Sequence, residues 1–206
     1  MATRKQTTEG TRQRLEQAAL VLFRDRGFHA VGLRDLAAEA GVSLGNVYNH
    51  FEGKDALFAA ILDRLYGEFA AATEPLARFL ITCRLPDDLE QLGDVMSEMV
   101  DRHRDYLRLV YVDIAEFGGK HARAHYKQLA PRFRAALPDK KHHGLPRWAD
   151  PGVVFTLIYM QFTNHFVVER LLGAKGYLGL GDKESTRAIV QLFLLGLAPR
   201  EGKASS

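Results

Sequence analysis

The chain has a single cysteine, Cys83, among its 206 residues. One thiol excludes an intramolecular disulfide, and a protein without disulfides is expected inside the cell. The sequence also has no run of about 18 apolar residues, which is the length that a membrane-spanning helix requires. Its N-terminus is polar and lacks the apolar core of a signal peptide. Together these absences predict a soluble, cytoplasmic protein.

The chain also has little excess of one charge over the other, because 28 basic and 25 acidic side chains leave a net charge of only +3. That balance does not by itself indicate a protein that binds nucleic acid. Near the N-terminus, however, the basic residues Arg4, Lys5, Arg12 and Arg14 face one acidic residue, Glu9. A flexible basic arm of this kind can follow a DNA backbone or enter a minor groove. For Arg4 and Lys5, a solvated tail is an equally good interpretation.

Sequence motifs for enzymatic chemistry are missing as well. There is no phosphate-binding loop, nucleophile elbow or catalytic-triad spacing, so we expect neither an enzyme nor a cofactor. The glycines of residues 173–181 follow no predicted strand and favour a flexible connection over a nucleotide-binding loop. His121 and His125 are four residues apart on one predicted helix and could chelate a metal ion. No acidic or sulfur ligand lies at a suitable spacing, so a solvated helix face is the preferred interpretation, and His142 and His143 fall in a predicted loop.

What the sequence does contain is a pattern for two short helices joined by a tight turn, between Val31 and Phe51. The apolar stripe of the first helix consists of Leu33, Leu36, Ala37 and Ala40, which recur at helical spacing. Gly41 is suited to the left-handed conformation that ends a helix. Ser43 is a good N-cap for the helix that follows.

The second of these helices is polar on one side. It buries Val47 and Phe51, four residues apart, and leaves its other side chains facing outward or along its rims. These are Leu44, Gly45, Asn46, Tyr48, Asn49 and His50. A helix with two Asn, a Tyr and a His on its exposed face suits the major groove of DNA.

Further helices flank this pair. Residues 14–28 form an amphipathic helix that ends at Gly27, with an apolar stripe of Leu15, Ala18, Ala19, Leu22 and Phe23. Downstream, Lys54 and Asp55 lie in the first turn of a new, long helix. Three helices around one small core, followed at once by a fourth, make a compact N-terminal module.

This module resembles the N-terminal domain of TetR-family transcriptional regulators. The resemblance runs in order and without gaps, and it is carried by Arg14, Ala18, Ala19, Leu22, Phe23, Gly27, Phe28, Leu33, Leu36, Ala37, Ala40, Gly41, Val42, Ser43, Gly45, Tyr48, Phe51, Lys54 and Leu57. The core of an ordinary helical bundle would explain the leucines and alanines. It would not explain Ser43, Gly45, Tyr48 and Lys54 together.

One position departs from the family. Gly32 stands where the family usually has Ser or Thr, whose hydroxyl caps the second helix and can reach a phosphate. Glycine is an acceptable cap that costs only a few tenths of a kcal/mol. Because the hydroxyl is absent, we expect Arg34 to take the phosphate from that end.

The resemblance and the outward-facing residues together predict a DNA-binding site. Backbone N–H groups at Ser43 and Gly45 are expected to meet a phosphate, as are Tyr48 and Lys54. The candidate base readers are Asn46, Asn49 and His50. The full predicted set is Arg34, Ser43, Leu44, Gly45, Asn46, Tyr48, Asn49, His50 and Lys54.

The remaining three quarters of the chain also have helical periodicity. The pattern predicts helices over residues 58–69, 86–99, 106–117, 121–137, 153–172 and 183–197. Pro75 and Gly118–Gly119 mark breaks, and residues 139–146 form a predicted loop. The last two helices are apolar on more than one face, which a small monomer cannot cover by itself. We therefore expect a two-fold dimer in which they pair with their copies as a four-helix bundle, as the resemblance also implies.

The predicted fold is all-α. It combines a helix-turn-helix DNA-binding domain with a basic arm, residues 1–54, and an antiparallel helical ligand-binding and dimerisation domain, residues 55–206. In the family the C-terminal helices enclose an inducer pocket, and the candidate lining here is Tyr66, His103, Tyr106, Tyr111, Phe117, Tyr126, Tyr159, Phe162, His165 and Phe166. For each of these residues alone, ordinary core is the better interpretation. Many rings and few fixed charges predict a mainly apolar small molecule as the effector.

The resemblance implies a ligand-responsive regulator, a repressor in the first instance, that binds a palindromic operator as a homodimer. Its two recognition helices would lie one turn of DNA apart, about 34–36 Å, and the ligand would favour a different separation. An enzyme and a helical scaffold that has lost DNA binding are the alternatives. Binding to a palindrome from the promoter beside its own gene distinguishes the three.

Overall fold

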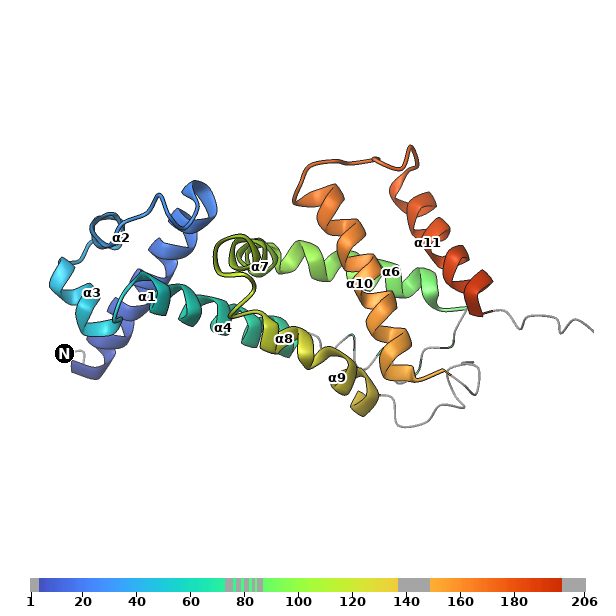
Figure 1. Ribbon diagram of the computed structural model, residues 1–206, viewed down its shortest axis with the longest axis horizontal. Helices are drawn as coiled ribbons and strands as arrows, with labels where there is room; N and C mark the ends of the chain where they lie inside the picture. The colour runs from blue at the N-terminus through green and yellow to red at the C-terminus, as the bar shows by residue number, and fades with distance from the viewer. Residues whose placement is uncertain are drawn as a thin grey trace, which may run out of the picture. The chain divides into compact units, whose positions relative to one another are not determined.

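The computed structural model describes residues 4–72, 76, 79, 82, 84, 87–136 and 149–197, and over these ranges it contains helices and connecting turns only. In chain order the helices are α1 (Arg4–Arg26), α2 (Leu33–Glu39), α3 (Leu44–His50), α4 (Lys54–Ala72), α6 (Leu89–Arg102), α7 (Arg104–Phe117), α8 (Arg123–Lys127), α9 (Leu129–Ala136), α10 (Pro151–Arg170) and α11 (Asp182–Leu197) (Figure 1). The predicted all-α class is confirmed. Pro75, Cys83 and the predicted loop 139–146, with His142 and His143, lie outside the described residues.

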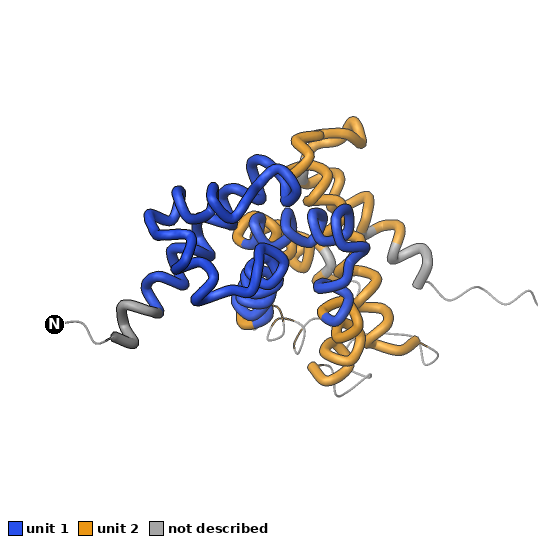
Figure 2. The backbone as a smooth tube through the Cα atoms, turned by 60° about the vertical axis from the view of Figure 1, so that its left-hand side comes forward, with its two compact units in different colours: residues 1–70, 103–124 blue, residues 71–102, 125–206 orange. Residues whose placement is uncertain are grey.

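The chain forms two compact units (Figure 2). The first comprises Met1–Ala70 and His103–Ala124, and the second comprises Ala71–Arg102 and His125–Ser206. The sequence predicted one boundary, after residue 54, where the DNA-binding module would end. Packing instead places most of α4 and all of α7 in the same unit as α1, α2 and α3. The boundary after residue 54 stays a prediction about function.

Helix α1 begins at Arg4, so the basic N-terminal segment is helical where a flexible arm was predicted. Thr11 is buried, and Arg12 Nε lies 3.1 Å from Glu16 Oε1, one helical turn further on. Such pairs at i and i+4 stabilise a helix, and they extend α1 beyond its apolar stripe. That stripe is confirmed, because its members are all buried: Leu15, Ala18, Ala19, Leu22 and Phe23.

Phenylalanine rings make up much of the core of the first unit. The ring centroid of Phe28 lies 5.2 Å from that of Phe23, 5.6 Å from that of Phe58 and 4.6 Å from that of Phe117. Phe58 and Phe117 are themselves 5.0 Å apart. These rings come from α1, the turn after it, α4 and α7. Aromatic contacts at these separations are favourable, so they hold α7 directly against the helix-turn-helix module.

Helix α10 is the central helix of the second unit, where it packs against α6, α9 and α11. It begins at an Asp-Pro pair: the Asp150 carboxylate accepts a hydrogen bond from the N–H of Val153 at 3.1 Å, and Pro151 follows in the first turn. Both residues favour the start of a helix. Its buried side includes Phe155, Phe162 and Phe166, so this side supplies the core of the unit.

Two glycines allow the helices of the second unit to approach closely. A Cβ atom at Gly93 would lie 2.5 Å from Thr186 Cγ2, where α6 meets α11. A Cβ atom at Gly152 would lie 2.6 Å from the carbonyl oxygen of Ala130, where α10 meets α9. Contacts this short essentially do not occur for real side chains, so a side chain at Gly152 would have to displace backbone, and one at Gly93 would have to displace the Thr186 side chain.

Residues 121–137 were predicted as one helix, and the structure divides them into α8 and α9. Pro131 explains the break, because it has no N–H to donate and its ring would clash inside a continuous helix. The interruption before Leu129 places Pro131 in the first turn of α9, where proline is tolerated. Apart from α1, which begins at Arg4 and not at residue 14, the other predicted helices agree with the structure except for a few residues at their ends, which is the usual uncertainty of helix boundaries.

Candidate nucleic-acid interface

The turn between α2 and α3 is built as the sequence predicts. Gly41 adopts a left-handed conformation with φ of +63°, and the N–H of Val42 donates to the carbonyl oxygen of Ala37 at 2.9 Å. This is the arrangement in which a glycine ends a helix and satisfies its last carbonyl groups. Ser43 Oγ then accepts a hydrogen bond from the N–H of Asn46 at 3.2 Å, so it caps α3. The two short helices are therefore joined by a fixed corner.

The start of α2 uses a cap that sequence reasoning missed. Gly32 has no side chain, but its N–H donates to Asp35 Oδ2 at 2.8 Å. An acidic side chain three residues into a helix can bond back to the N-cap in this way. Asp35 thus compensates in part for the missing Ser or Thr, and its position three residues after Gly32 was the available signal.

Helix α3 buries one side and exposes the other. Val47 is completely buried and Phe51 nearly so. Of the predicted DNA-binding residues, the exposed ones are Arg34, Ser43, Gly45, Asn46, Tyr48 and Asn49, and Leu44 and His50 are half-buried at the rims. Tyr48 is 57% exposed, which is unusual for a tyrosine in a folded domain. The structure therefore gathers a polar surface around α3 that could meet a nucleic acid.

Lys54, another predicted phosphate contact, points into the domain. Its Nζ donates to the carbonyl oxygens of Phe28 and Val31, each at 2.9 Å, and lies 4.4 Å from the centroid of the Phe28 ring. Two of its three N–H bonds are thereby used on the turn between α1 and α2. The predicted phosphate contact of Lys54 stays a prediction, but the structure gives the side chain a second role.

Sequence reasoning missed a network of charged residues next to α3. Glu16 is buried and binds two arginines, Arg12 Nε at 3.1 Å from Oε1 and Arg64 Nε at 2.9 Å from Oε2. Arg12 also lies over the ring of Phe51, 5.1 Å from its centroid. This network ties α1 to α4 and places a guanidinium beside the end of α3. The spacing of Arg12 and Glu16 could have indicated their pair, but not the contact with Arg64, which is 48 residues away from Glu16.

The predicted effector-binding residues of the first unit fall into separate places. The Phe69 ring centroid lies 5.0 Å from that of Tyr106 and 5.3 Å from that of His103, and Tyr66 lies 6.0 Å from Tyr106. These three predicted residues therefore share one aromatic cluster around Phe69. Phe117 belongs to the other cluster, with Phe28 and Phe58. Tyr111 is exposed.

In the second unit, four of the five predicted effector-binding residues are buried on α10. They are Tyr159, Phe162, His165 and Phe166, and the fifth, Tyr126, is exposed. The rings of Phe162 and Phe166 are stacked with centroids 6.3 Å apart, and the ring of His165 lies 5.0 Å from that of Phe166. Sequence reasoning missed Phe133, whose ring is 5.7 Å from that of Tyr159. The role of these residues in effector binding stays a prediction.

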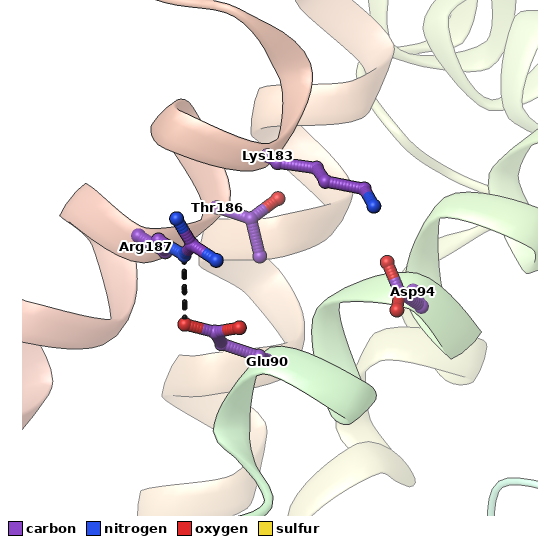
Figure 3. A pocket seen from close by; sticks show the side chains of 5 residues that line it. All are labelled: Glu90, Asp94, Lys183, Thr186 and Arg187. Carbon is purple, nitrogen blue, oxygen red and sulfur yellow. Dashed lines mark hydrogen bonds and ion pairs between the residues drawn. The ribbon is translucent and has the colours of Figure 1, made fainter.

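A polar pocket that the sequence did not indicate lies between α6 and α11. It has a volume of about 370 Å³ and is lined by Glu90, Asp94, Lys183, Thr186 and Arg187 (Figure 3). Arg187 Nε lies 3.1 Å from Glu90 Oε1 across it. Its charged lining differs from the aromatic one that we predicted for an apolar effector.

His121 and His125 do not form the solvated face that was predicted. His125 is buried, and the half-buried His121 ring packs 5.0 Å from Phe117 and 5.7 Å from Phe58. His121 Nδ1 lies 2.7 Å from Oδ1 of the fully buried Asp113, whose carboxylate also accepts the N–H of Ala122. Asp113 therefore draws the turn after α7 inward. Within the described ranges no group of three His, Cys, Asp or Glu residues is placed to hold a metal ion.

Taken together, an all-helical chain whose capped turn presents a polar second helix is a helix-turn-helix protein. Residues 16–61 match the family described as "Bacterial regulatory proteins, tetR family". A solved structure, that of the TetR-family transcriptional regulator ECA1819 from Pectobacterium atrosepticum, superimposes with a TM-score of 0.63 and 26% identity, over 97% of this chain and 100% of that one. The N-terminal part of this chain is therefore similar to the TetR family, and the chain as a whole has the fold of a TetR-family regulator.

Several relatives are named as repressors, among them the following two. The HTH-type transcriptional repressor KstR2 of Mycolicibacterium smegmatis is 36% identical over 131 residues, which cover 52% of this chain and 64% of the relative. The HTH-type transcriptional repressor SCO4008 of Streptomyces coelicolor is 27% identical over 193 residues, 88% of this chain and 96% of the relative. The chain spans about half the length of other curated relatives that it matches. The family consists of transcriptional regulators, so the enzyme alternative is set aside. Among the described residues, no helix has the length and apolar character needed to cross a membrane.

Proposed function

We propose that this protein is a ligand-responsive repressor that binds a palindromic operator as a homodimer and is released by a mainly apolar small molecule. The observation that carries the proposal is the surface of α3. Its polar residues are exposed around the completely buried Val47, and it is capped at both ends by the contacts of Ser43 and Phe51. A rigid helix with such a face can enter a major groove.

Contacts on this surface divide into positioning and base reading. The backbone N–H groups at the start of α3, with Tyr48 and the exposed Arg34, would bind phosphates. Asn46 and Asn49 would read bases, because a side-chain amide can bind adenine with two hydrogen bonds. Leu44 and His50 would contact the edges of the groove from the rims of the helix.

The outward side of α10 supports a homodimer. Val153, Leu157 and Met160 recur at helical spacing on that side, and all three are exposed in the single chain. Leu192 on α11 is exposed as well. Exposed apolar side chains at helical spacing are typical of an interface between protein chains. A two-fold axis through this surface would relate the two recognition helices, and a palindromic operator has the matching symmetry.

The contacts of α7 support a response to a ligand. Three of them reach the end of α1 and the turn after it: Arg24 Nη1 lies 3.8 Å from Asp105 Oδ1, His29 Nε2 lies 2.6 Å from Glu116 Oε2, and Phe28 packs on Phe117. A ligand that binds beside Tyr106 on the same helix could shift these contacts. It would release DNA only as far as it binds the two conformations with different affinity.

The experiment is a selection of DNA duplexes from a random pool by the wild-type protein, followed by a reporter gene placed behind the selected site. The proposal expects a palindromic sequence, repression of the reporter, and a dimer in light scattering. A variant with Asn46 and Asn49 both replaced by Ala serves as the control and should select no sequence. If the wild type enriched no sequence, the DNA-binding function would be excluded. If it stimulated the reporter, the repressor role would be excluded but DNA binding would stand.

A further inference from the structure

The pocket between α6 and α11 is lined by two pairs of like charges. Glu90 and Asp94 are four residues apart on α6, and Lys183 and Arg187 are four residues apart on α11. Like charges at this spacing are neighbours on the helix surface and repel each other. Each pair is therefore stabilised by opposite charge in front of it, and the two helices present their pairs to one pocket (Figure 3).

One of the two ion pairs across the pocket is formed and the other is not. Arg187 Nε lies 3.1 Å from Glu90 Oε1, whereas Lys183 and Asp94 lie on opposite sides of the pocket with no ion pair between them (Figure 3). Among the residues that the structure describes, neither Lys183 nor Asp94 has another hydrogen bond or ion pair. Over the described ranges the pocket thus presents an unpaired ammonium and an unpaired carboxylate.

Close packing beside the pocket sets the distance between the two helices. Thr186, which lines the pocket, is buried, and its Cγ2 atom leaves no room for a Cβ atom at Gly93 of α6. The helices are therefore already as close as their side chains allow. Since α6 and α11 cannot approach further, backbone packing preserves the space between Lys183 and Asp94.

The volume and the charges of the pocket define what it can bind. About 370 Å³ is near the lower end of the range of about 300–1,000 Å³ for ligand pockets, which favours a small molecule. A simple cation would leave Lys183 without a partner, and a simple anion would leave Asp94 without one. A small molecule that has both charges pairs with both residues. Its anionic group belongs at Lys183, because this residue lies in the first turn of α11, where the helix dipole favours negative charge.

We infer that this pocket binds a free amino acid, whose carboxylate accepts hydrogen bonds from the Lys183 ammonium and whose ammonium donates to the Asp94 carboxylate. Hydrogen bonds between charged groups are the stronger ones, and here they would join α6 to α11 through the ligand. The site is separate from the aromatic residues proposed for the apolar effector, and it does not depend on the proposed DNA binding. Because Lys183 and Asp94 are exposed, water and salt screen both contacts. We therefore expect a dissociation constant of about 0.1–1 mM.

The test begins with thermal unfolding of the full chain in the presence of each common protein amino acid, and of β-alanine, at about 10 mM. A ligand that binds only the folded state raises the Tm at this excess over its dissociation constant. Calorimetric titration then gives the affinity of the amino acid with the largest shift. Acetate and methylammonium are titrated in parallel, because each has one of the two charges, and both should bind at least tenfold more weakly.

Two variants with matched controls place the ligand in the pocket. Lys183→Met and Asp94→Asn each remove one of the unpaired charges and should weaken binding at least tenfold. Lys127→Met removes an exposed lysine of the same unit on α8, and Glu98→Gln removes a carboxylate one turn further along α6. Neither control should change the affinity. All four side chains are exposed, so the four variants are expected to fold.

Nuclear magnetic resonance provides a second readout, because the amide signals of Gly93 and Thr186 should shift when the amino acid binds. An absence of binding by every amino acid would overturn the inference. Acetate that bound as tightly as the amino acid would also overturn it, since the pocket would then be an anion site. Unchanged affinity in both Lys183→Met and Asp94→Asn would place the ligand elsewhere, with the same consequence. Because none of these measurements uses DNA, they are decided independently of the proposed function.

Discussion

Helices α3 and α10 each turn one side toward solvent, and the two exposed sides differ in chemistry. On α3 the exposed side chains are Asn46, Tyr48 and Asn49, whereas on α10 they include Val153, Leu157 and Met160. The polar side is well solvated by water, whereas covering the apolar side with another surface lowers the free energy of the system. The comparison indicates two kinds of partner, a nucleic acid for α3 and a second protein chain for α10.

The largest effect should come from a charge at the centre of the apolar side. Leu157→Glu would bury an unpaired carboxylate in the proposed dimer interface, at a cost of about 3–5 kcal/mol. We expect a monomer at micromolar concentration in light scattering, and a loss of operator binding that follows the loss of the dimer.

Ile114→Glu is the matched control, because Ile114 on α7 is 51% exposed and Leu157 is 56% exposed. It adds the same charge to an equally exposed apolar position of the other unit and should leave the dimer intact. A Leu157→Glu protein that stays dimeric would show that the outward side of α10 is not the interface. The exposed apolar residues of α10 would then not indicate a second protein chain as partner.

The covered side of α10 should tolerate change as poorly as a core. Gly152→Ala would place a methyl group 2.6 Å from the carbonyl oxygen of Ala130, against backbone that cannot easily move. We expect the free energy of unfolding to fall by about 1–3 kcal/mol, as overpacking does in other cores. Denaturant titration measures it.

The control for that variant is Gly67→Ala on α4. A Cβ atom at Gly67 would meet nothing within 4 Å, and alanine is the better helix former, so this change should stabilise the protein by up to about 1 kcal/mol. Equal effects of the two substitutions would mean that α9 and α10 are not in close contact.

On the polar side, single substitutions should change preference more than affinity. Asn46→Ala removes a candidate base reader and should alter the preference among duplexes by about tenfold, since one good contact to a base edge discriminates by about 1–3 kcal/mol. Arg34→Ala should weaken binding to all duplexes alike and reduce the salt slope by about one. Competition binding with variant duplexes measures both. If Asn46→Ala weakened all duplexes equally, Asn46 would be a positioning residue.

The smallest effect concerns the start of α10. A hydrogen bond from Arg134, with another from the N–H of Val153, lowers the pKa of the Asp150 carboxyl below its ordinary value of 3.8. A carboxyl with a lowered pKa stabilises the fold above pH 3.8, and that contribution disappears as the pH falls through the lowered value.

Asp150→Asn keeps an N-cap but removes the charge beside Arg134. It should lower the Tm slightly at pH 7, and the difference from the wild type should vanish in acid, as the pH falls through the lowered pKa of Asp150. Thermal unfolding across pH measures the difference. A Tm difference that persisted unchanged in acid would assign the effect to the cap and not to the ion pair.

Local sequence was enough for most of the helix-turn-helix. Gly41 and Ser43 act on residues within four positions of themselves, and the apolar stripes of α1, α2 and α3 repeat at the helical period, so short patterns predict both the corner and the exposed face. The all-α class followed for the same reason. The break between α8 and α9 was missed even though its cause, Pro131, is also local.

Contacts between distant residues decided the rest. Lys54 bonds to a turn more than twenty residues away, Glu16 joins Arg12 to Arg64 in another helix, and buried Asp113 turns His121 inward. Each pairing depends on how helices pack, which no periodicity encodes, because a charged residue on a helix looks the same in sequence whether it faces water or a buried partner. The sequence by itself determined the helices, their caps and the polar face of α3. Only the tertiary structure decided which charges face that surface and which hold it in place.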